Sequence, residues 1–175
     1  MKRYIAFLRA VNVGGTTIIK MSDLKRMFED FGLENVETFI QTGNVIFDSD
    51  ESRASLLEKK IEHQLAEAYG KQIRLFVRTT REVAGMVESC PFTPRNDETI
   101  YIAILEKKPD KKKVDALLSF RSAADDFAVV GKEVFNLRRD REASVFSNNF
   151  IEKALGVAGT TRNLTTVKKL AEKYV

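Results

Sequence analysis

The hydrophobic pattern of the chain predicts short apolar strands that alternate with amphipathic helices. Residues 4–11 are apolar except for Arg9 and are expected to form a buried strand, and the apolar residues that follow recur at the spacing of one helix face. Ser22 is expected to cap this helix and Gly32 to end it. The first half therefore predicts the order β-α-β-β-α-β, with elements at residues 4–11, 23–31, 36–42, 45–48, 52–69 and 73–78.

A second, similar pattern follows a short helix, for which Thr79 and Glu82 have the spacing of a capping box. The residues at 4–8 match those at 101–105 in four of five positions, and both halves share the order β-α-β-β-α, which indicates a duplicated unit. The second copy is expected to lack a final strand. Its elements are predicted at residues 100–105, 111–120, 127–130, 134–137, 149–155 and 164–174.

Together these patterns predict an α+β protein made of tandem ferredoxin-like (split β-α-β) subdomains with antiparallel sheets. Residues 1–90 form the first subdomain with its connecting helix. Prolines and polar residues at 91–97 predict a linker. Residues 98–175 form a second α+β subdomain with C-terminal helices.

Polar, glycine-bearing segments end the first strand and turn the first hairpin. In a split β-α-β unit the chain leaves strand one at the sheet edge where that hairpin turns, so the two segments should lie close together. Such segments expose backbone N–H groups and amide side chains that bind anions, although glycines and amides also serve turns and caps. The candidate ligand-binding residues here are Arg9, Asn12, Gly14, Gly15, Lys20, Gln41, Thr42, Gly43 and Asn44.

A third polar segment, residues 159–163, is expected to open the last helix. Its hydroxyls and Asn163 can cap that helix, and Arg162 beside the helix N-terminus can hold an anion. Thr161, Arg162 and Asn163 are therefore added to the candidate ligand-binding residues. The sequence does not place them relative to the other two segments.

The composition excludes several kinds of chemistry. The chain has 175 residues, a net charge of +4, one cysteine and one histidine. Cys90 cannot form an internal disulfide and is expected to be a buried apolar side chain; His63 is expected on an exposed helix face. Ser-His-Asp or Cys-His catalysis and a metal site are therefore not predicted, and the sequence assigns neither a reaction nor a cofactor. No segment has the length of a membrane span, and the reducing cytoplasm is the expected compartment.

A dense basic stretch lies at the start of the helix at 111–120. Cations there oppose the helix macrodipole, so local stability does not explain them, whereas solvation or a nucleic-acid contact would. An RNA recognition motif would need aromatic residues at the positions of Asn44 and Ile46, and that platform is absent. The basic residues are Lys107, Lys108, Lys111, Lys112 and Lys113, with Arg138, Arg139 and Arg141 further along.

Three motifs in this order resemble one bacterial family, the domain of unknown function 1697. They are the segments at 9–15 with Met21 and Leu24, at 41–47, and at 160–163 with Thr166 and Val167. The resemblance spans essentially the whole chain and implies two linked α+β subdomains of ferredoxin-like character, with no established activity. The family usually carries tryptophan where this chain has Leu164, which favours a packing role at that position.

Three functions follow as hypotheses. The first is binding of a small polar or anionic ligand, such as a nucleotide or phosphorylated metabolite, at the glycine- and asparagine-rich sheet edge. The second is a nucleic-acid-binding module that uses the basic stretches. The third is a structural or interaction protein without a ligand. The oligomeric state is not predicted.

Overall fold

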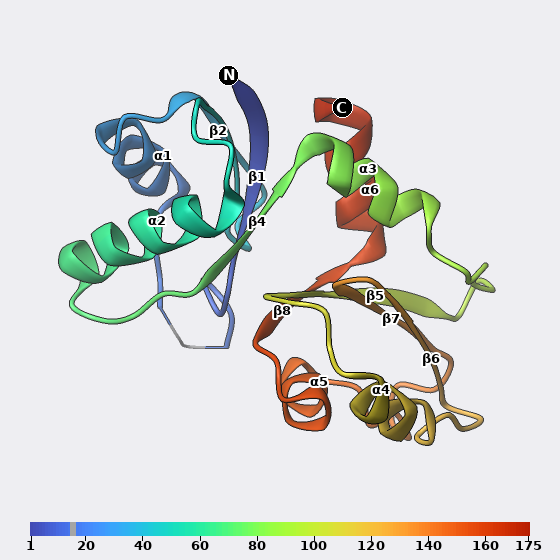
Figure 1. Cartoon of the computed structure of the whole chain (residues 1–175). Helices are drawn as coiled ribbons and strands as arrows, with labels where there is room; N and C mark the ends of the chain where they lie inside the picture. The colour runs from blue at the N-terminus through green and yellow to red at the C-terminus, as the bar shows by residue number, and fades with distance from the viewer. Residues whose placement is uncertain (15–16) are drawn as a thin grey trace. The chain divides into compact units, whose positions relative to one another are not determined.

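The computed structural model describes residues 1–14 and 17–175. Gly15, one of the candidate ligand-binding residues, lies outside the described residues. The chain divides into two compact units, Met1–Val83 with Val175 and Ala84–Tyr174 (Figure 1). Within the described residues the two units contain six α-helices and two four-stranded antiparallel sheets, so the expected α+β class is confirmed.

The sheet of the first unit has the order β2-β3-β1-β4, and every neighbouring pair of strands is antiparallel. Helices α1 and α2 both lie on one face of it (Figure 1). A further helix, α3 (Thr80–Glu88), follows β4. The elements of this unit are β1 (Lys2–Leu8), α1 (Met21–Asp30), β2 (Glu34–Phe39), β3 (Asn44–Ser49), α2 (Ala54–Tyr69) and β4 (Leu75–Thr79).

The core of the first unit lies between the sheet and these two helices. Side chains alternate between the two faces of a strand, so Tyr4, Ala6 and Leu8 of β1 share the face that packs against the helices. The Tyr4 ring stacks on Phe47 of β3 with 5.7 Å between centroids. The helices contribute Leu24, Phe28, Leu57, Ile61 and Leu65, all buried.

The helix ends confirm one expected cap and correct another. Thr79 and Glu82 form the expected capping box: the Thr79 N–H donates to Glu82 Oε2 at 2.7 Å, and the Glu82 N–H donates to Thr79 Oγ1 at 3.2 Å. The prediction that Ser22 caps α1 is wrong, because α1 begins at Met21, two residues earlier than expected, and its N-cap residue is Lys20. Lys20 has no side-chain acceptor, so no side chain caps this helix end among the described residues.

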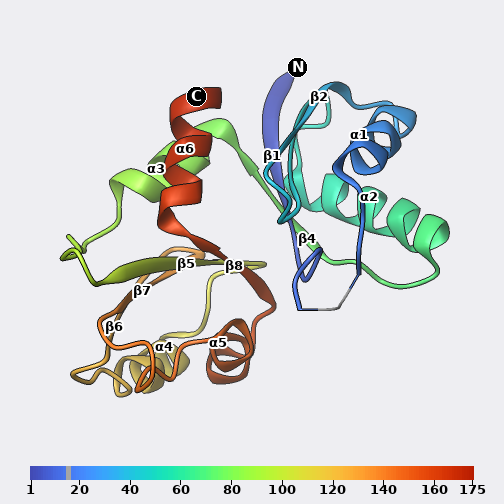
Figure 2. The same ribbon diagram turned by 180° about the vertical axis from the view of Figure 1, so that it is seen from behind.

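The sheet of the second unit has the order β6-β7-β5-β8, again with every neighbouring pair antiparallel. Helices α4 and α5 lie on one face and α6 lies on the other (Figures 1 and 2). The elements are β5 (Thr99–Leu105), α4 (Lys111–Leu118), β6 (Asp125–Val130), β7 (Glu133–Arg138), α5 (Asn148–Leu155), β8 (Gly159–Asn163) and α6 (Leu164–Tyr174).

The final strand that the second half was expected to lack is present. Residues 159–163 do not open the last helix but form β8, which pairs antiparallel with β5. Gly159 allows this pairing, because a Cβ there would lie 2.9 Å from the Ile104 carbonyl oxygen. Only Asn163 has the expected capping role: its Oδ1 accepts the Thr165 N–H at 2.9 Å at the start of α6. Both halves therefore have the order β-α-β-β-α-β.

A buried carboxylate fixes the segment between β7 and α5. Asp125 is 1% exposed, and its Oδ1 accepts hydrogen bonds from Asn136 Nδ2 at 2.9 Å and Ser144 Oγ at 2.7 Å. Its Oδ2 accepts the Val145 N–H at 2.8 Å. The next residue, Phe146, stacks on Tyr101 of β5 with 5.3 Å between centroids. Asp125 therefore holds this connection against the sheet.

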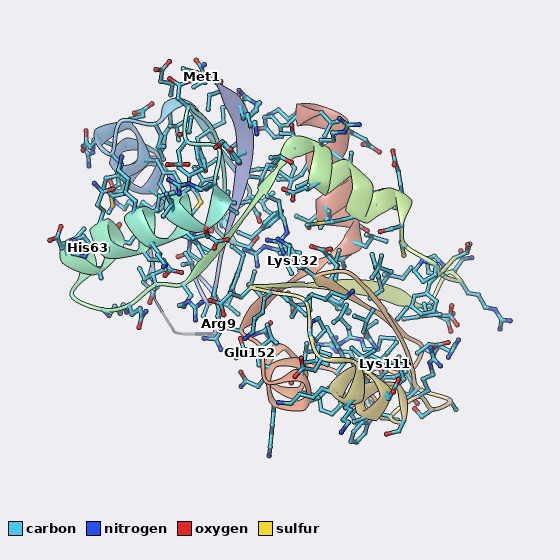
Figure 3. The ribbon with its side chains drawn as sticks, viewed as in Figure 1. Met1, Arg9, His63, Lys111, Lys132 and Glu152 are labelled. Atoms are coloured by element: carbon cyan, nitrogen blue, oxygen red, sulfur yellow. The ribbon has the colours of Figure 1, made fainter. Side chains whose placement is uncertain are left out.

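The single histidine and the single cysteine have different surroundings. His63 lies on α2, is 73% exposed and contacts Glu67 at 3.3 Å, as expected for a surface histidine (Figure 3). Cys90 is half-buried instead of buried, because it follows the end of α3, and its Sγ donates to the Phe92 carbonyl oxygen at 3.8 Å. Among the described residues, no helix is long and apolar enough to cross a membrane.

Candidate functional site

Backbone hydrogen bonds connect the end of β1 to the turn between β2 and β3 and to the segment before β4. The Leu8 N–H donates to the Gly43 carbonyl oxygen at 2.8 Å, and the Arg9 N–H donates to the Arg74 carbonyl oxygen at the same distance. The Asn12 N–H then donates to the Thr17 carbonyl oxygen, also at 2.8 Å. Half-buried Arg9 thus lies at the end of β1 (Figure 3). The two polar segments share one edge of the first sheet, as the strand order requires.

Asn12 connects three pieces of backbone at this edge. Its Nδ2 donates to the Gln41 carbonyl oxygen at 2.8 Å and to the Ile19 carbonyl oxygen at 2.9 Å. Its Oδ1 accepts the Ile19 N–H at 2.8 Å. Both amide N–H bonds are therefore engaged by backbone, and the side chain holds the two segments together instead of reaching toward a ligand.

Asn44 has a comparable role inside the hairpin. It is fully buried, and its Nδ2 donates to the Phe39 carbonyl oxygen at 3.0 Å and to Thr42 Oγ1 at 3.1 Å. Gly43 between them has φ +80°, and a Cβ at this position would lie 3.0 Å from Leu8 Cβ. Thr42, Gly43 and Asn44 therefore shape the turn, and the exposed face of the edge is left to other residues.

Unusual backbone conformations concentrate at this edge. Among the described residues, four non-glycine residues have positive φ, and three of them lie here: Ala10 at 55°, Asn12 at 57° and Ile40 at 51°. Gly14 follows at 56°. A β-branched residue such as Ile40 is strongly disfavoured in this region, and each such position costs about 1–3 kcal/mol. Strain of this kind clusters at ligand sites, where the surrounding structure maintains it.

A pocket of about 530 Å³ opens beside the strained segment, at the N-terminus of α1. The first N–H groups of any helix lack intrahelical acceptors, and here no side chain among the described residues caps them. Lys20 adds a positive charge, and exposed Val13 and Ile18 add apolar surface. The lining residues are Asn12, Val13, Ile18, Ile19, Lys20, Met21, Ser22 and Gln41.

Three of the candidate residues, Asn12, Lys20 and Gln41, therefore meet around this pocket. The pocket also contains residues that the motifs did not indicate, above all Ser22 and Ile18. The sequence predicts Ser22 as a cap, whereas it lies in the first turn of α1. Exposed Ile18 carries no sequence signal, because a single apolar residue in a loop is common.

The third polar segment belongs to the second unit. Arg162 on β8 is buried, and its Nη1 donates to Thr160 Oγ1 at 2.9 Å and to the Thr161 carbonyl oxygen at 3.0 Å. Burial lowers the pKa of the Arg162 guanidinium to about 10, so this side chain stays charged at neutral pH. Thr161 Oγ1 donates to Asn148 Oδ1 at 2.9 Å. Leu164, where the resemblance leads one to expect tryptophan, is 4% exposed, in line with a packing role.

Arg162 has a counterpart in the first unit that the motifs missed. Arg78 on β4 is 2% exposed and is opposite Ile5 in the ladder with β1, just as Arg162 is opposite Ile102 in the ladder with β5. The Nη1 of Arg78 donates to the Val77 carbonyl oxygen at 3.1 Å. The sequence signal that indicates Arg78 is a charged residue near the end of an apolar strand. The two units therefore share a buried arginine at the equivalent ladder position.

The structure predicts that Asn12→Ala lowers the free energy of unfolding by about 2–3 kcal/mol, because three hydrogen bonds are lost and alanine tolerates positive φ less well than asparagine. Urea denaturation measures the change. Asn12→Gly is the matched control, since glycine accepts the backbone conformation and loses only the amide. Wild-type stability of Asn12→Gly would show that the amide bonds do not hold this edge.

Comparison with known proteins gives a family and a fold. The model of a family described as protein of unknown function (DUF1697) matches residues 1–135. The chain is similar to a solved structure, the conserved bacterial protein SP0830 from Streptococcus pneumoniae, with 21% sequence identity and a TM-score of 0.76. The similarity covers 98% of this chain and 97% of that chain, and at this identity it shows the fold alone. No curated protein matches the chain.

Proposed function

The chain belongs to the DUF1697 family of proteins of unknown function, and from the geometry of its first unit we propose that it binds a small anionic ligand, a nucleotide or phosphorylated metabolite. The binding site is the pocket at the N-terminus of α1. The observation that carries the proposal is the uncapped helix end, which lines a pocket of about 530 Å³ together with Lys20. Pockets of about 300–1,000 Å³ are typical of small-molecule sites.

The chemistry of the lining fits a ligand with one charged and one apolar part. The free N–H groups of α1, the Lys20 ammonium and the Ser22 hydroxyl are donors for a phosphate. On the other side, Val13 is 54% exposed and Ile18 is 80% exposed, so both offer apolar surface. A base or a carbon chain attached to the phosphate would cover that surface. Asn12 supports the site by fixing the backbone at Ile19 and Gln41.

We further propose that each unit is a ferredoxin-like, split β-α-β subdomain. The strand orders β2-β3-β1-β4 and β6-β7-β5-β8, with consecutive elements β-α-β-β-α-β in each unit, support this assignment. The polar stretch at 91–97 remains the proposed linker. The cytoplasm remains the proposed compartment, on the single free thiol of Cys90.

Ligand titration tests the proposed site. AMP, ADP, ribose 5-phosphate and inorganic pyrophosphate are screened by thermal shift, and any that raise Tm are titrated calorimetrically. Lys20→Ala is expected to weaken binding of the phosphate-bearing probe about 10- to 30-fold, which corresponds to the loss of one charge-assisted hydrogen bond of about 1.5–2 kcal/mol.

Lys59→Ala is the matched control, because Lys59 is an exposed lysine on α2 that does not line the pocket. It removes the same charge and should leave Kd unchanged. Equal Kd values for wild type and Lys20→Ala would place the ligand elsewhere. If none of the four probes shifts Tm, the proposed ligand class is wrong and a structural role for the edge is favoured.

A further inference from the structure

Five lysines follow one another where β5 ends and α4 begins in the second unit. All are exposed, and none forms an ion pair within the part of the chain that the structure describes. Figure 3 marks Lys111 at the start of α4. The five residues are Lys107, Lys108, Lys111, Lys112 and Lys113.

The position of these lysines works against the stability of α4. Lys111, Lys112 and Lys113 occupy the first turn, where the helix macrodipole is positive and cations are unfavourable. The first turn has no acidic residue, and the N-cap residue Asp110 makes no side-chain capping bond. Local stability therefore gives no reason for three lysines here. An external anion would neutralise both the lysines and the helix end.

Two hollows lie side by side along this stretch, because Lys108 lines both of them. One has a volume of about 190 Å³ and is lined by Lys107, Lys108, Asp110, Lys113, Leu155, Gly156 and Val157. The other has a volume of about 340 Å³ and is lined by Lys108, Pro109, Lys111, Val114, Val129 and Gly131. Neither lining contains an aromatic side chain for base stacking.

Lys113 differs from the other four lysines. Its ammonium lies against Gly156, the residue that ends α5, so closely that a Cβ there would displace it. A cation at this place stabilises the negative end of α5. Lys113 therefore has a structural role of its own. The remaining four, Lys107, Lys108, Lys111 and Lys112, are named the α4 lysine surface.

We propose that the α4 lysine surface binds the phosphate backbone of single-stranded nucleic acid. Lysine ammonium groups bind phosphates as compact point charges, and adjacent hollows that share Lys108 can hold successive phosphates of one strand. Without aromatic residues in either hollow, the contact is independent of base sequence. This surface lies in a different unit from the pocket at α1, so it is a second binding function.

Fluorescence anisotropy with labelled oligouridylate of about 12 nucleotides tests the proposal. With four phosphate contacts, the slope of log K against log salt is expected near −3, and binding weakens about 50-fold between 50 and 200 mM salt. Replacing all four lysines of the surface by glutamine should remove nearly all of this slope. The control replaces four exposed lysines elsewhere by glutamine, so its net charge is the same; these are Lys2, Lys59, Lys71 and Lys169.

Thermal unfolding separates a binding role from a structural one. Because Lys111 and Lys112 oppose the macrodipole, the surface variant is expected to gain about 2–4 °C in Tm while it loses RNA binding. Equal loss of binding in the control would overturn the proposal, since net charge alone would then explain it. Absence of RNA binding by wild type at about 50 mM salt, or equally tight binding of polyglutamate, would also overturn it.

Discussion

Gly43→Ala is expected to lower the free energy of unfolding by about 2–5 kcal/mol. Two effects add at this position. The left-handed conformation, φ +80°, costs an alanine about 1–2 kcal/mol. The new Cβ would also lie 3.0 Å from Leu8 Cβ and 3.4 Å from Val11 Cβ, both buried, and such overpacking costs about 1–3 kcal/mol. Leu8 cannot move away easily, because its N–H is bonded to the Gly43 carbonyl oxygen at 2.8 Å.

Gly32 provides the control for this prediction. It has the same φ, +80°, but a Cβ there would meet no atom within 4 Å. Gly32→Ala should therefore show only the cost of the backbone conformation, about 1–2 kcal/mol. Urea denaturation of both variants measures the difference. If Gly43→Ala costs no more than Gly32→Ala, the close approach of the hairpin to the end of β1 contributes nothing to stability.

The elements that could be predicted are those whose apolar spacing or capping residues are visible in the sequence itself. The apolar run of β1 and the stripe containing Leu24 and Phe28 specify a strand and a helix before any tertiary contact is known. The capping box at Thr79 and Glu82 is equally local, because its bonds span three residues. These elements and the hairpin at Gly43 are present in the predicted order, although β1 ends at Leu8 instead of Val11 and α1 begins at Met21.

β8 could not be predicted in this way, because its own residues show no strand pattern and it forms only by pairing with β5. The sequence Gly159-Thr160-Thr161-Arg162-Asn163 has no apolar alternation. It becomes a strand because β5 offers a free edge, and because Gly159 permits the close approach to the Ile104 carbonyl oxygen. Thr160 and Arg162, both buried, then take positions that apolar residues usually hold. This is why the final strand of the second unit was not predicted.

The sequence predicts that the two polar segments share one sheet edge, but it does not indicate what each of their side chains contacts. Strand order alone brings Asn12 and Gln41 to one edge, and the hydrogen bond between them is 2.8 Å long. What each amide side chain contacts depends on the local course of the backbone. The positive φ of Ala10 and Asn12 changes that course at this edge. Residue types do not reveal these conformations. Asn12 and Asn44 therefore maintain the edge, while the proposed ligand contacts move to Lys20 and the start of α1.

The largest effect on stability is expected at a residue that no motif indicated. Asp125→Ala should lower the free energy of unfolding by about 3–5 kcal/mol, because it removes the acceptor for Ser144 Oγ, the Val145 N–H and Asn136 Nδ2 inside a buried site. Asn136 is fully buried, and its Oδ1 already lacks a partner among the described residues.

The neighbouring acid, Asp126, provides the matched control for Asp125→Ala. It is partly exposed, pairs with Arg121 at 3.0 Å and Arg139 at 3.6 Å, and accepts the Phe127 N–H at 2.8 Å, so Asp126→Ala removes the same charge at a cost of about 1–2 kcal/mol. Hydrogen exchange reports the local consequence: protection of the Val145 amide should disappear in Asp125→Ala and persist in Asp126→Ala. Since the segment from β7 to α5 is anchored through Asp125, retained protection in Asp125→Ala would mean that the Tyr101–Phe146 stack holds the segment instead.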